Sequence, residues 1–155
     1  MNFIYPIPDS QWVSPLVIVP KMSGKWRVCI DYRELNKATL KDHFTLPFID
    51  QVLDTLAGKN YFSFLDGFSG YNQIQVAPED QDKTTFTCPW ENFTYRVLPF
   101  GLCNAPATFQ RAVLGTVSDL IHYCVEVYKD DFSFYVNTFQ EALENLKKVL
   151  KRSNK

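Results

Sequence analysis

Three pairs of short strand-like runs, each joined by a short polar turn, constrain the fold of this chain more than any other feature. The runs are residues 16–19 with 26–32, 83–89 with 93–98, and 123–128 with 132–136. They are rich in Val, Phe, Tyr and Thr, and such runs around short turns pair as antiparallel hairpins. The sequence therefore predicts antiparallel sheet rather than a doubly wound parallel sheet.

Three helices are expected between and after these hairpins. Pro47 and Gly58 bound the first, Asn104 precedes the second, and Thr138 with Glu141 forms a capping box that opens the third. Each segment repeats apolar residues at helical spacing, which predicts one packed face per helix. Strands mixed with helices in this way predict an α+β fold. The first eleven residues carry two prolines and no periodicity, so they are expected to form an extended lead-in.

Composition is that of one folded domain without a general attraction to polyanions. Of 155 residues, 46% are hydrophobic and the formal net charge is −1, which excludes a disordered chain and gives no overall pull toward nucleic acid or membrane. The four cysteines form no CxxC pair, and no signal peptide or apolar run of membrane-spanning length is apparent. These features favour an intracellular protein, cytoplasmic or nuclear, with no membrane partner.

Three acidic residues stand at positions where strands end. Asp66 follows the strand-like run 61–65, and Asp130 with Asp131 occupies the tip of the third hairpin. Each alone is typical of a turn, where aspartate bonds the backbone. Together they could supply hard oxygen ligands for Mg²⁺, and two such ions can support phosphoryl transfer.

Six segments resemble, in order, the motifs of reverse transcriptases from long-terminal-repeat retrotransposons, especially the gypsy type. They are WVSPLVIVPK, GKWRVCIDYRELNKAT, FSFLDGFSGYNQI, KTTFTC, YRVLPFGLCNAPATFQR and VYKDDFSFY. The likeness extends from Tyr5 to Leu150. It implies the core of a right-hand polymerase: an antiparallel palm sheet that carries Asp66, Asp130 and Asp131 and is backed by helices.

The resemblance also implies a single partial domain over residues 1–155, without the thumb. Residues 12–45 and 74–103 correspond to the fingers, and residues 46–73 and 104–152 correspond to the palm. A thumb and a ribonuclease H region are expected in full-length relatives.

Site residues are implied position by position. Asp66, Asp130 and Asp131 match the catalytic aspartates that hold two Mg²⁺ ions, with Mn²⁺ as an alternative. The residues that match nucleotide-binding positions are Lys21, Arg27, Tyr71, Phe100 and Gly101. Those that match positions on the template and primer side are Arg33, Gln110, Tyr128 and Lys129. Other interpretations stay open for three of them: a solubilising role at a hairpin tip for Lys21, a core position for Phe100, and an ion pair with Glu34 or Asp31 for Arg33.

The implied function is RNA-directed DNA polymerase. A primer 3′-hydroxyl would attack the α-phosphate of a deoxynucleoside triphosphate, with RNA or DNA as the template. Three departures from the family favour a competing hypothesis, a truncated remnant without turnover: Lys129 replaces an apolar residue, Val136 and Asn92 replace glycines, and the length falls short of the family's thumb. A metal-dependent nuclease ranks last, because no histidine or lysine base lies near Asp66 in the sequence. Without the downstream regions, the last helix and the Val125–Tyr135 hairpin are expected to expose apolar faces.

Overall fold

The computed structural model describes residues 2–45, 47–67, 69–128 and 131–153, and the chain forms two compact units. Unit 1 consists of Met1–Asp42 and Ser69–Ala105, and unit 2 consists of His43–Phe68 and Pro106–Lys155. Each unit therefore combines two stretches that are separated in the sequence. The α+β composition predicted from the sequence is confirmed by the elements of both units.

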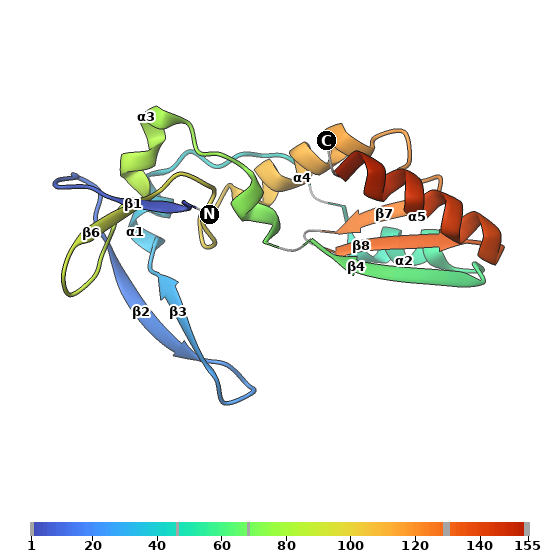
Figure 1. Ribbon diagram of the computed structural model, residues 1–155, viewed down its shortest axis with the longest axis horizontal. Helices are drawn as coiled ribbons and strands as arrows, with labels where there is room; N and C mark the ends of the chain where they lie inside the picture. Colours follow the sequence, from blue (N-terminus) through green and yellow to red (C-terminus); the bar gives the residue numbers. More distant parts are fainter. Residues whose placement is uncertain (1, 46, 68, 129–130, 154–155) are drawn as a thin grey trace. The chain divides into compact units, whose positions relative to one another are not determined.

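Unit 1 is built on a five-stranded sheet in the order β1-β6-β5-β2-β3 (Figure 1). The strands are β1 Ile4–Pro6, β2 Ser14–Pro20, β3 Trp26–Ile30, β5 Phe86–Thr87 and β6 Asn92–Tyr95. All neighbours pair antiparallel except β2 and β5, which are parallel. The β2–β3 hairpin confirms the first predicted strand pair. Short helices complete the unit: α1 Arg33–Ala38, η1 Gly70–Gln73, α3 Pro78–Gln81 and η2 Asp82–Thr84.

Two expectations for unit 1 were wrong. The N-terminal lead-in forms β1, which pairs with β6 so that Ile4 lies opposite Tyr95. Because β1 is an edge strand, its terminal Pro6 removes no hydrogen bond that the sheet interior needs. Residues 82–84 form a helical turn instead of the start of a strand, and the Asp82 carbonyl accepts bonds from the backbone and hydroxyl of Thr85.

Buried polar groups tie the small helices of unit 1 to its sheet. The Tyr32 ring is 2% exposed, and its hydroxyl donates to the Thr84 carbonyl at 2.8 Å. The Thr84 and Thr94 hydroxyls lie 3.0 Å apart, and Thr94 also donates to the Gln81 carbonyl. Since buried polar groups without partners are costly, this network favours one arrangement of residues 78–95.

Unit 2 is a three-stranded antiparallel sheet in the order β4-β8-β7, covered by helices (Figure 1). The strands are β4 Tyr61–Asp66, β7 Val125–Tyr128 and β8 Asp131–Val136, and the helices are α2 Ile49–Leu56, α4 Ala105–Val117 and α5 Phe139–Ser153. Helix α5 packs on β8 and β4, whereas α2 contacts β7. The predicted capping box is present, since the Glu141 amide donates to the Thr138 hydroxyl at 3.4 Å.

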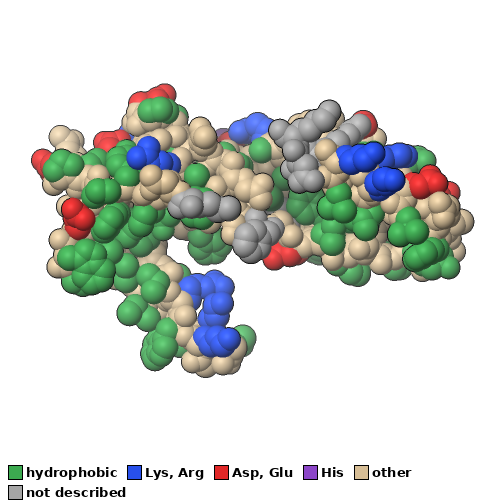
Figure 2. Space-filling model, viewed as in Figure 1, with side chains coloured by type: hydrophobic (Ala, Val, Ile, Leu, Met, Phe, Trp, Pro, Cys, Tyr) green, Lys and Arg blue, Asp and Glu red, His purple; other side chains and the backbone are tan. Residues whose placement is uncertain are grey.

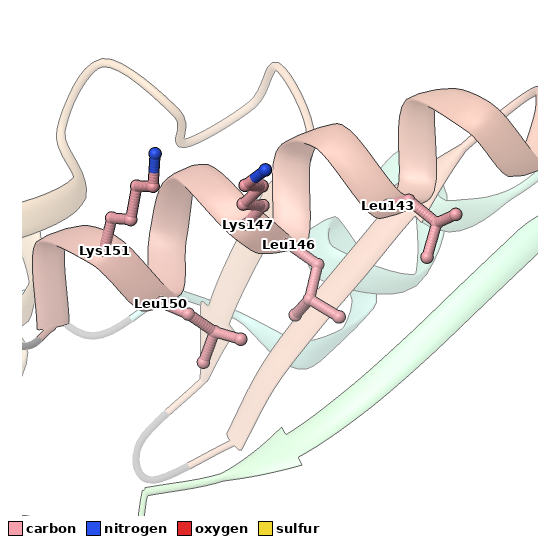
Figure 3. Close-up of a pocket in the computed structure, with 5 residues that line it drawn as sticks. All are labelled: Leu143, Leu146, Lys147, Leu150 and Lys151. Atoms are coloured by element: carbon pink, nitrogen blue, oxygen red, sulfur yellow. The ribbon is translucent and has the colours of Figure 1, made fainter.

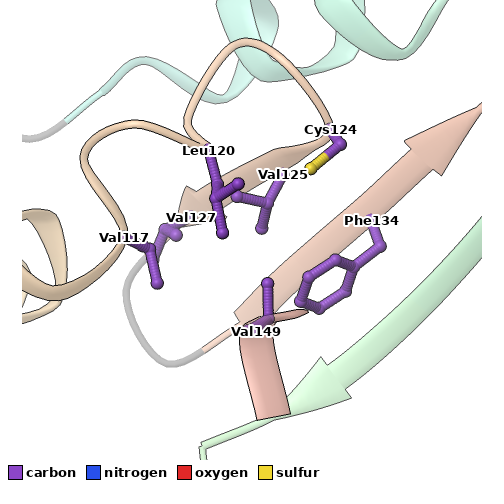
Figure 4. Packing of buried hydrophobic residues seen from close by; sticks show 7 residues of the cluster. All are labelled: Val117, Leu120, Cys124, Val125, Val127, Phe134 and Val149. Atoms are coloured by element: carbon purple, nitrogen blue, oxygen red, sulfur yellow. The ribbon is translucent and has the colours of Figure 1, made fainter. Parts of the chain in front are cut away.

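One apolar cluster holds the sheet of unit 2 to its helices. Val117, Leu120, Cys124, Val125, Val127, Phe134 and Val149 are all buried and in contact (Figure 4). Side chains alternate between the two faces of a strand. Val125, Val127 and Phe134 therefore share the face on which Val117 and Val149 pack.

The exposed apolar surface of unit 2 agrees only in part with the expectation from the sequence. Helix α5 does expose Leu143 and Leu150, at 49% and 50%, and Figure 3 shows these two side chains with Leu146 along one side of the helix. These leucines line a shallow hollow of about 270 Å³ together with Lys147 and Lys151. In the described part of the Val125–Tyr135 hairpin, however, Val125, Val127 and Phe134 are buried in the cluster with Val117 and Val149. The exposed apolar strand is the edge strand β4, with Phe62 at 45% and Phe64 at 69%.

No helix in the described part of the chain is both long enough and apolar enough to span a membrane.

Alkaline pH should destabilise unit 2 through Tyr135. Burial and the neighbouring Glu126 raise the pKa of Tyr135 to about 12. The neutral phenol therefore contributes stability that is complete below pH about 10 and is lost as the pH rises through about 12. In Tyr135→Phe, the free energy of unfolding should fall less steeply over this window. Denaturant titrations at several pH values test this, and equal slopes for both proteins contradict it.

The uncovered leucines of α5 should bind a hydrophobic dye. Fluorescence of the dye should rise with the native protein and fall about twofold or more in Leu143→Gln/Leu150→Gln, because the exposed apolar area shrinks. Lys147→Gln, which changes the charge at the same hollow, serves as the control. A native protein that does not bind the dye contradicts the expectation.

Candidate active site

Asp66 and Asp131 lie directly opposite each other at one end of the unit 2 sheet. The β4–β8 register runs from Tyr61 opposite Val136 to Asp66 opposite Asp131, and both acids are exposed. Cβ atoms of directly opposed residues are about 4.5–5.5 Å apart, so one cation can reach both carboxylates. Two of the three predicted acids, distant in sequence, are thus brought together.

The electrostatics of this pair favour a bound cation. Two adjacent carboxylates repel each other, and either a proton or a metal ion relieves the repulsion. Mg²⁺ needs few protein carboxylates, because water and substrate phosphates complete its coordination, so an exposed pair of this kind fits it. No group of three or more His, Cys, Asp or Glu side chains with metal-binding geometry occurs among the described residues. The third predicted acid, Asp130, and its neighbour Lys129 lie outside the described residues.

The strand beside this pair brings two of the predicted template-side residues nearby. Tyr128 ends β7 and lies opposite Asp131. Gln110 comes from α4; its side chain is 1% exposed, and its amide nitrogen donates to the Val127 carbonyl at 3.2 Å. The partner of Gln110 is thus the strand that ends at Tyr128, opposite Asp131. Because the Gln110 side chain is buried in this conformation, it is not accessible for a direct contact with a template strand.

Two predicted nucleotide-binding cations lie at the exposed end of the β2–β3 hairpin. Arg27 is opposite Val19, and the Lys21 amide donates to the Lys25 carbonyl at 2.7 Å to close the tip. On the opposite face, Ile18 pairs with Val28 and Pro20 with Trp26. Figure 2 shows Lys and Arg side chains on one side of the hairpin end and apolar side chains on the other. Arg27 therefore lies on the face opposite Val28 and Trp26, a face that it shares with Val19.

Tyr71 and Phe100 meet in unit 1. Their ring centroids are 6.3 Å apart with an interplanar angle of 71°, an edge-to-face contact. Phe100 is 67% exposed, which excludes the alternative that it is a core residue. Gly101 follows with φ +105°, and its carbonyl accepts a bond from the Asn36 amide at 2.8 Å. A side chain there would be strained, so glycine at position 101 is a backbone requirement.

Arg33 forms an ion pair with Asp31, the alternative raised by the sequence. Its guanidinium contacts both carboxylate oxygens, with an Nη2–Oδ2 distance of 2.6 Å. The bonds from Arg33 lower the pKa of Asp31 to about 2. The Arg33 side chain is still 83% exposed, so part of the guanidinium remains open to solvent.

The two residues that replace family glycines, Asn92 and Val136, carry no backbone penalty. Val136 lies in regular β8 opposite Tyr61. Among the described non-glycine residues, only Ser69 and His122 have positive φ, so neither Asn92 nor Val136 needs the conformation that glycine favours. A β-branched residue is therefore accommodated at position 136, which continues the ladder with β4.

A buried carboxylate on β7 was not predicted from the sequence. Glu126 is 5% exposed, with Oε1 at 2.8 Å from the His122 ring nitrogen and 3.4 Å from the Tyr135 hydroxyl. Its only sequence signal is an acid within an apolar run, Val125–Tyr128. That pattern is equally typical of an exposed strand position.

Comparison with known proteins identifies the family. Residues 19–155 match the family described as "Reverse transcriptase (RNA-dependent DNA polymerase)". The chain belongs to the reverse transcriptase family. Enzymes of this family generally use divalent metal ions, in accord with the acidic pair. The identity predicted from the motifs, a reverse transcriptase domain like those of retrotransposon polyproteins, is confirmed.

Relatives of this reverse transcriptase segment include polyproteins and a shorter homologue. The Pol polyprotein from transposon 412 of Drosophila melanogaster is 40% identical over 146 residues, covering 90% of this chain and 12% of that polyprotein. An RNA-directed DNA polymerase homolog of Oenothera berteroana is 39% identical over 126 residues, covering 79% of this chain and 89% of that protein. The chain thus spans a small part of the polyproteins it matches.

A solved reverse transcriptase supports the fold. The foamy viral protease-reverse transcriptase in complex with RNA/DNA hybrid has a TM-score of 0.88 and 28% identity, covering 97% of this chain and 20% of that one. The predicted α+β fold of a polymerase fingers and palm core is confirmed by this likeness.

Substitution of Gly101 should destabilise the chain through its backbone. Gly101→Ala places a Cβ at φ +105° and 3.5 Å from the Tyr32 ring, and we expect a loss of about 1–2 kcal/mol. Gly115→Ala in α4, where nothing lies within 4 Å, should be neutral or stabilising by up to about 1 kcal/mol. Denaturant unfolding measures both, and equal effects of the two substitutions contradict the assignment.

Proposed function

We propose that this chain is the fingers and palm part of a gypsy-type retrotransposon reverse transcriptase that extends a primer on an RNA or DNA template. The observation that carries the proposal is the register that sets Asp66 opposite Asp131 at the end of β4 and β8. Family membership and the likeness to a foamy viral enzyme in complex with RNA/DNA hybrid support it. Unit 2 is then the palm, and unit 1 corresponds to the fingers.

The acidic residues are assigned to metal binding. Asp66 and Asp131, with Asp130 next to it in the sequence, would hold two Mg²⁺ ions, for which Mn²⁺ can substitute. When bound, the ions lower the pKa of the primer hydroxyl and neutralise charge on the phosphates of the incoming nucleotide. The contribution of the chain is to keep the carboxylates fixed and adjacent through the β4–β8 ladder, so that repulsion does not separate them.

The remaining residues are assigned to the nucleotide and to the strands. Lys21 and Arg27 are exposed cations on one hairpin and suit triphosphate oxygens. The exposed Phe100 ring and the half-buried Tyr71 ring provide aromatic contacts for the sugar and base, beside the backbone of Gly101. Arg33, Tyr128 and Lys129 are assigned to the template and primer side. The free cysteines fit a reducing compartment, and we place the reaction in the cytoplasm or nucleus.

Primer extension tests the proposal. Wild-type chain should extend a primer on a homopolymer template with Mg²⁺. Asp131→Asn should lower the rate about a hundredfold or more, since metal ions supply several kcal/mol of transition-state stabilisation. Asp54→Asn, the same change at an exposed position of α2, is the matched control and should leave the rate unchanged.

Lys129 in the Tyr128–Asp131 box is one of the departures that favour the competing hypothesis, a remnant without turnover. If the wild type does not extend the primer and Lys129→Met does, Lys129 is the cause of the inactivity. The proposal is overturned if the wild type and Lys129→Met are both folded, neither extends the primer, and neither binds Mg²⁺ or Mn²⁺ in a calorimetric titration.

A further inference from the structure

Gln110 is a buried polar side chain that the proposed chemistry does not use. It lies on the face of α4 that also carries Val113 and Val117, both packed in or against the apolar cluster of unit 2. At 1% exposure its amide is removed from water, and its Oε1 has no hydrogen-bond partner among the described residues. Burying an amide whose oxygen has no partner costs free energy. We therefore expect the amide nitrogen of Gln110 to make a hydrogen bond that offsets this cost.

That contact is made to a carbonyl that the sheet itself cannot satisfy. The Tyr135 amide donates to the Cys124 carbonyl at 3.0 Å, so residue 124 points its backbone groups toward β8. In an antiparallel ladder this direction alternates along the strand. The carbonyls of Val125 and Val127 therefore point outward, to the side of β7 where the sheet ends.

Both outward carbonyls are capped from within unit 2. The His122 amide donates to the Val125 carbonyl at 3.2 Å, which is a backbone contact. The Val127 carbonyl accepts from the Gln110 amide nitrogen, also at 3.2 Å. Only the second cap depends on a particular side chain. It is also the one beside Tyr128, which pairs with Asp131, which in turn lies opposite Asp66.

We propose that Gln110 is a positioning residue for the acidic site: by holding the outer edge of β7 it keeps Asp131 in register with Asp66. This inference rests on the proposed function for its consequence, because the register matters only if the two carboxylates bind a metal ion together. It assigns Gln110 a role that acts through the β7 backbone and needs no direct contact with a template strand. The outer partners of metal ligands contribute about 10–100-fold to metal affinity in other proteins.

The experiment compares Gln110→Met with wild-type full chain. Methionine keeps the length and packing of the side chain but cannot donate a hydrogen bond. Amide hydrogen exchange at Tyr128 and Asp131 should accelerate about tenfold, while the Tyr135 amide at the far end of the ladder keeps its rate. The dissociation constant for Mn²⁺, measured by calorimetry, should rise about tenfold.

The control is Thr116→Val on the same helix. It removes the exposed bond from the Thr116 hydroxyl to the Ala112 carbonyl and should change neither the exchange rates nor the Mn²⁺ affinity. If Gln110→Met does not unfold cooperatively, Gln110→Asn, which retains an amide one methylene shorter, replaces it with the same expected direction of change.

The outcomes separate this inference from the proposed function. Unchanged exchange at Tyr128 and Asp131 in a folded Gln110 variant overturns the positioning role. Faster exchange there with unchanged Mn²⁺ affinity also overturns it, because register then has no bearing on the metal. A wild type that binds no Mn²⁺ counts against the metal site itself, and with it against the proposed function.

Discussion

The pairing of β4 with β8 is the constraint on which the rest of this structure depends. It places two like charges, Asp66 and Asp131, side by side at the end of a sheet, an arrangement that electrostatic repulsion opposes. The ladder holds because the same strands carry apolar side chains on their other face. Phe134, at 6% exposure, packs with Val149 of α5 in the cluster that closes the sheet. Burial on one face thus stabilises an unfavourable pair on the other.

The candidate residues of unit 1 are positioned differently from those of unit 2. In unit 1 they stand on an exposed hairpin and at a loop where two aromatic rings meet, and neither set depends on a large core. The hairpin keeps apolar side chains such as Trp26, at 72% exposure, on the face opposite its cations. What fixes the unit is the hydrogen-bonded network around Tyr32, Thr84 and Thr94, because each of these buried polar groups loses its partner if the loops shift.

Much of this architecture can be predicted from the sequence, and the exceptions have physical causes. Hairpins and capped helices are local, so alternation and turn residues identify them. The pairing of β1 with β6 joins residues about ninety positions apart, and nothing local in a proline-rich segment indicates a partner. The adjacency of Asp66 and Asp131 was expected from the family resemblance, whereas the burial of Gln110 and Glu126 depends on packing that no single-residue pattern reveals.

The interleaving of the two units bears on how the chain can be dissected. The backbone passes from one unit to the other after Asp42, Phe68 and Ala105, so each unit is assembled from a pair of separate stretches. A single cut of the backbone between the crossing after Asp42 and the crossing after Ala105 therefore divides both units. Neither half can then be excised as an autonomous module. Fragment complementation, in which two cleaved pieces refold together, is therefore the route by which such a chain can be taken apart and rebuilt.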